Sequence, residues 1–211
     1  MDSGTPAEPS YPPEPWNLAG QAYVSVWRLP AEQLAGRVPQ GLRPLTVGGQ
    51  VFVGTAWVDY EPSGLLPYHE LVAAVLVRDG VRPIVTVTEI WVDSPASLAG
   101  GRAMWGIPKE LAQFEMTHEP SFTARADTAA GVIASAEIQR GSGLPIRLPS
   151  WFTVAQTVDG HGRQTPVHAT GHPHTASANW KINPDGPLGY LHGLTPAVTF
   201  ALRDLRLRFG S

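Results

Sequence analysis

The sequence contains no cysteine, which excludes a disulfide framework and a thiolate metal site. No apolar run approaches the roughly 18 residues that a membrane-spanning helix needs. The acidic, proline-rich N-terminal segment lacks the basic and apolar regions of a signal peptide. These absences predict a cytoplasmic protein with no membrane partner.

Charged residues are scarce, at 16% of the chain against 43% hydrophobic residues, and the net charge is −3. A nucleic-acid-binding protein would carry a basic stripe, so we expect no nucleic-acid partner. Disorder is excluded as well, because it requires low hydrophobicity and high net charge. So few charges on 211 residues also predict that partner subunits cover part of the surface, as in a homo-oligomer.

Lysine is nearly absent: of 15 basic residues, only Lys109 and Lys181 are lysines. A solvating lysine can be replaced by arginine, whereas a lysine that must lose its proton cannot, because guanidinium stays charged. Lys109 has apolar neighbours, and burial disfavours the charged form of an amine. One interpretation is therefore an amine nucleophile that forms a Schiff base with a carbonyl group. The other is an exposed lysine in a turn.

The chain is expected to form one domain, residues 16–211, preceded by a flexible proline-rich arm, residues 1–15. A helix is predicted over 94–105, with Ser94 as N-cap and Pro95 at its first position. Asp79-Gly80 predicts a hairpin between two apolar strands. Further strands are predicted over residues 21–28, 50–60, 113–117, 121–126, 132–139, 151–158, 177–182 and 198–209. Short strands with few helices predict a β-rich (α+β) fold, built as a barrel or sandwich.

Two motifs carry a resemblance to a known family. Gly-Arg-x-x-x-Gly-x-Pro-Lys at 101–109 follows Ser-Gly-Leu-x-x-Tyr-x-Glu at 63–70, at the spacing seen in the acetoacetate decarboxylase superfamily. The chain resembles that superfamily from about Tyr23 to Phe114. The resemblance implies a closed β barrel or cone with an internal cavity and a few short helices.

The resemblance also assigns roles to residues. Lys109 falls on the family's Schiff-base lysine, and Glu70 falls on one of its two active-site glutamates. The chain departs from the family elsewhere, with Thr55 at the position of the other glutamate and Gly20 at that of a substrate-binding arginine. Glu110 stands where the decarboxylases have a second lysine. We therefore expect burial, and not a neighbouring cation, to lower the pKa of Lys109.

These departures shape the expected function. An arginine suits a carboxylate because its planar fork binds bidentately, so its loss argues against efficient acetoacetate decarboxylation. Iminium and enamine chemistry remain open to Lys109, with Glu70 as the acid/base. The chain resembles the aldolase-dehydratase and natural-product branch more than the true decarboxylases. The expected function is a lyase that acts on a small oxo acid or ketone.

Around the lysine, the expected substrate-binding positions are Trp105, Ile107, Thr55 and Gly20, with Trp105 and Ile107 keeping the amine dry. No cofactor or metal is expected, because the iminium itself accepts electrons. Two alternatives stay open: a natural-product cyclase or isomerase that uses the cavity without a covalent step, and a non-catalytic ligand-binding protein.

Two groups of polar residues outside these motifs have more than one interpretation. His161, His168, His172 and His174 either bind zinc or lie on a solvated hairpin, and the hairpin is favoured because metal motifs give false positives. Glu89 either lines the cavity or lies at the surface. His69 and Glu70 are adjacent on one strand, so they should face opposite sides of the sheet.

Overall fold

The computed structural model describes residues 10–211, which form mainly β-structure. The strands are β1 (Trp16–Pro30), β2 (Arg43–Pro44), β3 (Gln50–Tyr60), β4 (Tyr68–Asp79), β5 (Arg82–Val92), β6 (Lys109–Leu111), β7 (Gln113–Thr117), β8 (Phe122–Thr128), β9 (Gly131–Gly143), β10 (Leu148–Val158), β11 (His161–Ile182) and β12 (Val198–Phe209). The helices in this range are α1 (Pro95–Trp105) and two short 3₁₀ helices, η1 (Ala31–Leu34) and η2 (Gly189–Leu191). Residues 1–9 of the predicted arm lie outside the described range.

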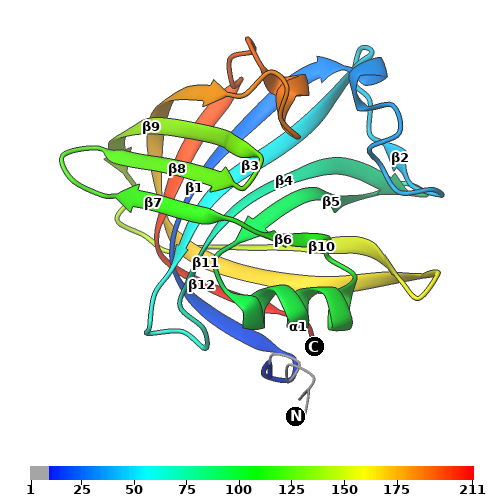
Figure 1. The fold of residues 1–211 in the computed structure, drawn as a ribbon, viewed down its shortest axis with the longest axis horizontal. Helices are drawn as coiled ribbons and strands as arrows, with labels where there is room; N and C mark the ends of the chain where they lie inside the picture. The colour runs from blue at the N-terminus through cyan, green and yellow to red at the C-terminus, as the bar shows by residue number, and fades with distance from the viewer. Residues whose placement is uncertain (1–9) are drawn as a thin grey trace, which may run out of the picture.

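The strands belong to a single curved sheet with the order β10-β5-β4-β3-β1-β12-β11-β9-β8-β7 (Figure 1). The strand β10 pairs with β11 as well as with β5, so the pairings from β10 through β5, β4, β3, β1, β12 and β11 return to β10 and close a ring. The strands β7 to β9 continue beyond β11, and α1 lies beside β6 and β10. This ring agrees with the expectation of a closed β structure.

Successive side chains of a strand point to opposite faces, and here both faces of the central strands are buried. On β3, Trp57 lies in one core cluster and Val58 in another. The cluster with Val58 also contains Trp105 and Ile107 from the end of α1, and we call it the α1-side core. The cluster with Trp57 contains residues of β8 and β9, and we call it the β8-side core. A buried residue on these strands therefore faces one of two separate interiors.

Most of the predicted elements are present. The Asp79-Gly80 hairpin joins β4 to β5, although Asp79 is itself paired with Arg82, so the two loop residues are Gly80 and Val81. The helix prediction over 94–105 is confirmed, as are the strands at 113–117 and 198–209. The segment 161–174, for which no strand was predicted, is the first part of β11 and forms a hairpin with β10. Its backbone groups bond to β10 and β12, which outweighs the poor strand propensity of its glycines and prolines.

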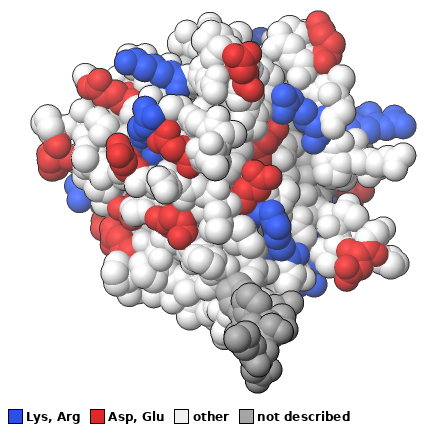
Figure 2. Space-filling model, in the orientation of Figure 1, with Lys and Arg blue, Asp and Glu red and all other residues white. Residues whose placement is uncertain are grey.

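The surface of the described residues carries mixed charges. On the face in Figure 2, acidic and basic side chains are interspersed, and no continuous basic stripe crosses it. Within residues 10–211, no helix is both long and apolar enough to cross a membrane.

Candidate active site

The segment around Lys109 is shaped by local sequence signals. Helix α1 begins at Pro95, where the Ser94 side chain accepts a hydrogen bond from the Ser97 backbone N–H, as an N-cap does. It ends at Gly106, which has a φ of 64° in the left-handed region that favours glycine. A Cβ at Gly106 would lie 2.2 Å from the Thr157 carbonyl oxygen, so this position requires glycine for a second reason. The chain then turns directly into β6.

Strand β6 directs the adjacent side chains of Lys109 and Glu110 to opposite faces of the sheet. It runs parallel to β5, with Lys109 beside Ile90 and Glu110 beside Trp91. The Glu110 carboxylate accepts a hydrogen bond from Trp91 Nε1 at 3.2 Å, in the direction of the β8-side core. Lys109 points the opposite way, beneath α1. Glu110 therefore does not contact the Lys109 amine.

The Lys109 amine is buried and surrounded by three oxygen atoms. Its side chain is 4% exposed. The Nζ atom lies 2.7 Å from Ser97 Oγ, 3.1 Å from Glu70 Oε2 and 3.4 Å from the Tyr68 hydroxyl. The Tyr68 hydroxyl in turn donates to Glu70 Oε2 at 3.4 Å. An amine, a carboxylate and two hydroxyls thus meet in one largely dry site.

Burial lowers the pKa of the Lys109 amine, and the Glu70 carboxylate partly opposes this effect. Burial also raises the pKa values of the Tyr68 and Tyr60 phenols, with the Glu70 charge adding to the rise. Both phenols are therefore held in the protonated form. The direction and the cause of the Lys109 shift agree with the sequence-based expectation.

Two of the predicted neighbours lie in the same core as the amine. Trp105 and Ile107 are both buried in the α1-side core. The Trp105 indole packs edge-on against Trp16 and donates a hydrogen bond to Glu14. The ring centroid of Trp16 lies 5.9 Å from Lys109 Nζ, within the range of a cation–π contact. Trp105 packs against Trp16 and reaches the amine through it.

The structure does not bring Thr55 to the amine. Thr55 lies on the face of β3 that carries Trp57, and its hydroxyl accepts a hydrogen bond from Trp27 Nε1 at 2.9 Å. Gly20 pairs with Tyr60 on the neighbouring strand β1. A Cβ at Gly20 would lie only 1.9 Å from the Asp59 carbonyl oxygen.

Glu89 and the histidines lie elsewhere. The Glu89 side chain is 12% exposed, bonds to Arg37 and Tyr190, and lies on the β8-side face beside Ala73. His161 begins β11, and His168, His172 and His174 follow along this strand of the β10–β11 hairpin. No group of three or more histidine, aspartate or glutamate residues that could hold a metal ion is found among residues 10–211.

Sequence reasoning missed three contacts of the amine, namely Tyr68, Ser97 and Trp16. Tyr68 lies two residues before Glu70 on β4, and strand alternation places such residues on one face. That signal was available in the motif. Nothing local indicates Ser97 or Trp16, because both reach the amine only through tertiary packing.

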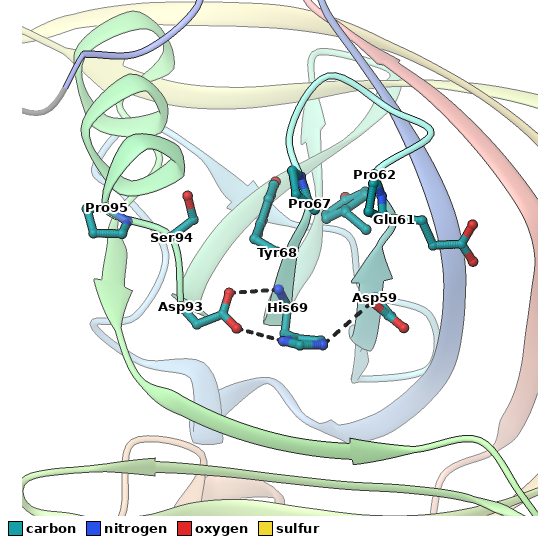
Figure 3. Close-up of a pocket in the computed structure, with 10 residues that line it drawn as sticks. Asp59, Glu61, Pro62, Pro67, Tyr68, His69, Asp93, Ser94 and Pro95 are labelled. Atoms are coloured by element: carbon teal, nitrogen blue, oxygen red, sulfur yellow. Dashed lines mark hydrogen bonds and ion pairs between the residues drawn. The ribbon is translucent and has the colours of Figure 1, made fainter.

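An open cleft of about 600 Å³ adjoins the site, between the β3–β4 connection and the start of α1 (Figure 3). Its lining residues are Asp59, Tyr60, Glu61, Pro62, Pro67, Tyr68, His69, Asp93, Ser94 and Pro95. Tyr68 belongs both to this cleft and to the contacts of Lys109. As expected, His69 faces away from Glu70, and its ring bonds to Asp93 at 2.6 Å.

The fold and this site define a β-rich protein with a buried lysine between a strand and a helix. The family model described as acetoacetate decarboxylase (ADC) matches residues 3–151, so the chain belongs to the acetoacetate decarboxylase family. The match extends well beyond the segment on which the sequence resemblance rests.

Individual relatives agree with this assignment. The acetoacetate decarboxylase 3 of Mesorhizobium japonicum is 29% identical over 118 residues, which are 53% of this chain and 43% of that protein. The chain spans about half the length of the curated relatives that it matches.

Solved structures share the fold. The acetoacetate decarboxylase of Legionella pneumophila has a TM-score of 0.71 at 19% identity, with 99% of this chain and 91% of that chain covered. The enduracididine biosynthesis enzyme MppR has a TM-score of 0.68 at 14% identity, with 99% and 90% covered. The predicted β-rich, acetoacetate-decarboxylase-like fold is thereby confirmed.

Proposed function

We propose that this protein is a Schiff-base-forming lyase that acts on a small ketone or oxo acid, with Lys109 as the nucleophile and Glu70 as the acid/base. One observation carries the proposal: the Lys109 amine is buried, has a lowered pKa, and contacts a carboxylate and two hydroxyls. An amine nucleophile must be neutral to attack, and desolvation favours the neutral form.

The residues supply each proton transfer. Glu70 accepts a proton from the Lys109 ammonium, and the neutral amine attacks the substrate carbonyl carbon. The C–N bond forms as the C=O π electrons move onto oxygen, and one proton of the attacking nitrogen passes to this oxygen, which becomes a hydroxyl group. Glu70 then returns its proton to this hydroxyl, which leaves as water while the nitrogen lone pair forms the C=N bond of the iminium. The iminium accepts electrons from an α-C–H or α-carbon–carboxylate bond.

The role of the remaining polar groups follows from the same geometry. Ser97 and Tyr68 hold the amine by accepting its hydrogen bonds, and Tyr68 also donates to Glu70. Trp16, Trp105 and Ile107 keep water away from the amine. Acetoacetate decarboxylation is expected to be inefficient, because Gly20 leaves no arginine at that position to hold the carboxylate.

Borohydride trapping tests the proposal. Reduction in the presence of a ketone or oxo acid should add the ligand mass to the peptide that contains Lys109. The exposed Lys181 serves as an internal control, and Lys109→Arg, which keeps the charge, should abolish the specific label. Equal labelling of both lysines, or none, would contradict the covalent mechanism and favour a non-covalent or non-catalytic protein.

We also propose that the protein is a homo-oligomer, with the segment 144–152 in the contact. Every residue of this segment is exposed. Its large apolar side chains are Leu144, Ile146, Leu148, Trp151 and Phe152. Together they expose on the order of several hundred Å², about as much as the largest apolar patch of a typical monomer.

A second copy of this chain is the partner that fits this segment best. The segment has no acidic residue, and Arg147, its single basic residue, is bonded to Thr170 and to the Asp204 carbonyl of its own chain. A mainly apolar patch whose one charged side chain is bonded within its own chain offers little to an oppositely charged partner, whereas its apolar side chains can pack against the same patch of a second copy across a two-fold axis.

A further inference from the structure

The cleft beside α1 and the buried amine share the side chain of Tyr68. Tyr68 lines the cleft, and its hydroxyl contacts Lys109 Nζ. Its ring lies 4.6 Å from that of Tyr60, another cleft residue. In Figure 3, Tyr68 lies between the β3–β4 loop and the first residues of α1, which also delivers Ser97 to the amine. A molecule in this cleft therefore lies next to a side chain that contacts the nucleophile.

The walls of the cleft carry an excess of negative charge. Asp59, Glu61 and Asp93 line it, while lysine and arginine are absent from its lining. His69 is the one basic group there, and it is held by Asp93 at 2.6 Å and by Asp59 at 3.6 Å. His118, outside the lining, bonds to Asp59 at 2.8 Å. Even with both histidines protonated, the three carboxylates leave one net negative charge in the cleft.

The backbone prevents a cation from being added at the position where the family's arginine aligns. A Cβ at Gly20 would lie 1.9 Å from the Asp59 carbonyl oxygen and 2.9 Å from the Tyr60 Cα atom. These are backbone atoms of the paired strand, so they cannot move aside without breaking the β1–β3 ladder. The absence of a cation at this position is thus built into the fold.

We propose that this cleft is the route by which substrates reach Lys109, and that its carboxylates select uncharged ketones and aldehydes over oxo acids. The proposal rests on the function proposed above and narrows its substrate class. An anionic carboxylate in the cleft meets the excess negative charge of Asp59, Glu61 and Asp93, with no guanidinium in the lining to bind it. Each pair of like charges lowers the occupancy of the anion about fivefold at 4 Å even in water, and less at longer range.

A matched pair of ligands tests this selection. Pyruvate and methyl pyruvate differ in one negative charge and present the same ketone. Each is trapped with borohydride, and the label on Lys109 is divided by the label on Lys181 to cancel the difference in intrinsic reactivity. We expect this ratio to be about tenfold higher for the ester. The gap should narrow at high salt, because exposed charges are screened.

Two variants locate the origin of the selection. Glu61→Gln removes one cleft charge, and the Glu61 side chain makes only a long 3.4 Å contact with Gln21. It should raise the pyruvate ratio about threefold. Glu32→Gln makes the same change of charge at an exposed position of η1, outside the cleft lining, and should leave the ratio unchanged.

The outcomes separate this inference from the proposed function. If neither ligand labels Lys109 above Lys181, the Schiff-base function itself fails. If both ligands label Lys109 but pyruvate labels it as well as the ester, only the charge selection is overturned. Equal effects of the two glutamate variants would likewise overturn the role of the cleft.

Discussion

Gly101 of α1 packs directly on the side chain of Lys109. A Cβ at Gly101 would lie 2.8 Å from Lys109 Cδ and 2.9 Å from Cε. The helix lies this close to the stem of the lysine because position 101 has no side chain. The first glycine of the 101–109 motif thus leaves space for the side chain of the final lysine of the same motif.

Gly101→Ala should displace the Lys109 stem and reduce borohydride trapping at Lys109. Overpacking of this kind costs about 1–3 kcal/mol of unfolding free energy. Chemical denaturation and quantitative trapping measure the two effects. Gly162→Ala is the control, because a Cβ there meets no atom within 4 Å. Full trapping in Gly101→Ala would show that the lysine has room to move.

Lys109 should titrate below its ordinary pKa of 10.5, because burial outweighs the attraction of Glu70. Competitive amine labelling across pH measures this value directly. Glu70→Gln should lower the pKa further, since Glu70 is the group that raises it. Glu110→Gln should change it little, because Glu110 bonds to Trp91 on the other face. A larger effect from Glu110 than from Glu70 would contradict this arrangement.

Thr55→Val should destabilise the fold without reducing the labelling of Lys109. The change leaves the buried Trp27 indole N–H without its acceptor, at a cost of about 1–3 kcal/mol. Denaturation and trapping distinguish this structural effect from a role in substrate binding. Thr123→Val, in an exposed pair with Thr117, is the control and should cost less than about 0.5 kcal/mol. Loss of trapping with unchanged stability would assign Thr55 to the site instead.

The His69–Asp93 pair should stabilise the fold most in mildly acidic solution. The hydrogen bond to Asp93 raises the pKa of His69 above 6.5. The stability that His69 contributes is therefore complete below pH 6.5 and is lost as the pH rises through its folded-state pKa. Burial alone would raise the pKa of Asp93, but bonds from His69 lower it below 3.8. The Asp93 contribution is therefore complete above pH 3.8 and is lost as pH falls through its folded-state pKa.

Thermal melts of Asp93→Asn test this window. The variant should lose more stability relative to wild type at pH 5.5 than at pH 9, by no more than about 1 kcal/mol for so exposed a pair. Asp185→Asn, in an exposed turn, should show no such pH dependence. An equal loss at both pH values would show that the pair acts without a change in charge.

Trp151→Glu should dissociate the proposed oligomer. The indole is 70% exposed in one chain, and burying a charge there against a second copy is costly. Light scattering after size-exclusion chromatography measures the mass. Val81→Glu, at a position that is 97% exposed in the β4–β5 loop, should keep the wild-type mass. A monomeric wild type, or an unchanged Trp151→Glu oligomer, would exclude this contact.

Local chemistry explains why part of the structure could be predicted. The Ser94 cap, Pro95 and Gly106 fix the two ends of α1, because caps and left-handed glycines act within a few residues. Strand alternation placed His69 and Glu70 on opposite faces for the same reason. The β11 segment was missed because its many glycines and prolines argue against a strand, while pairing with three other strands stabilises one.

The sequence by itself determined the β-rich fold, the helix before Lys109, and the lysine and glutamate of the candidate site. These features depend on residue type and short spacing, and motifs record both. Only the tertiary structure decided that Thr55 lies on the other face, that Ser97 and Trp16 reach the amine, and that carboxylates line the neighbouring cleft. Those relations depend on strand register and on the packing of α1, which join residues far apart in the chain.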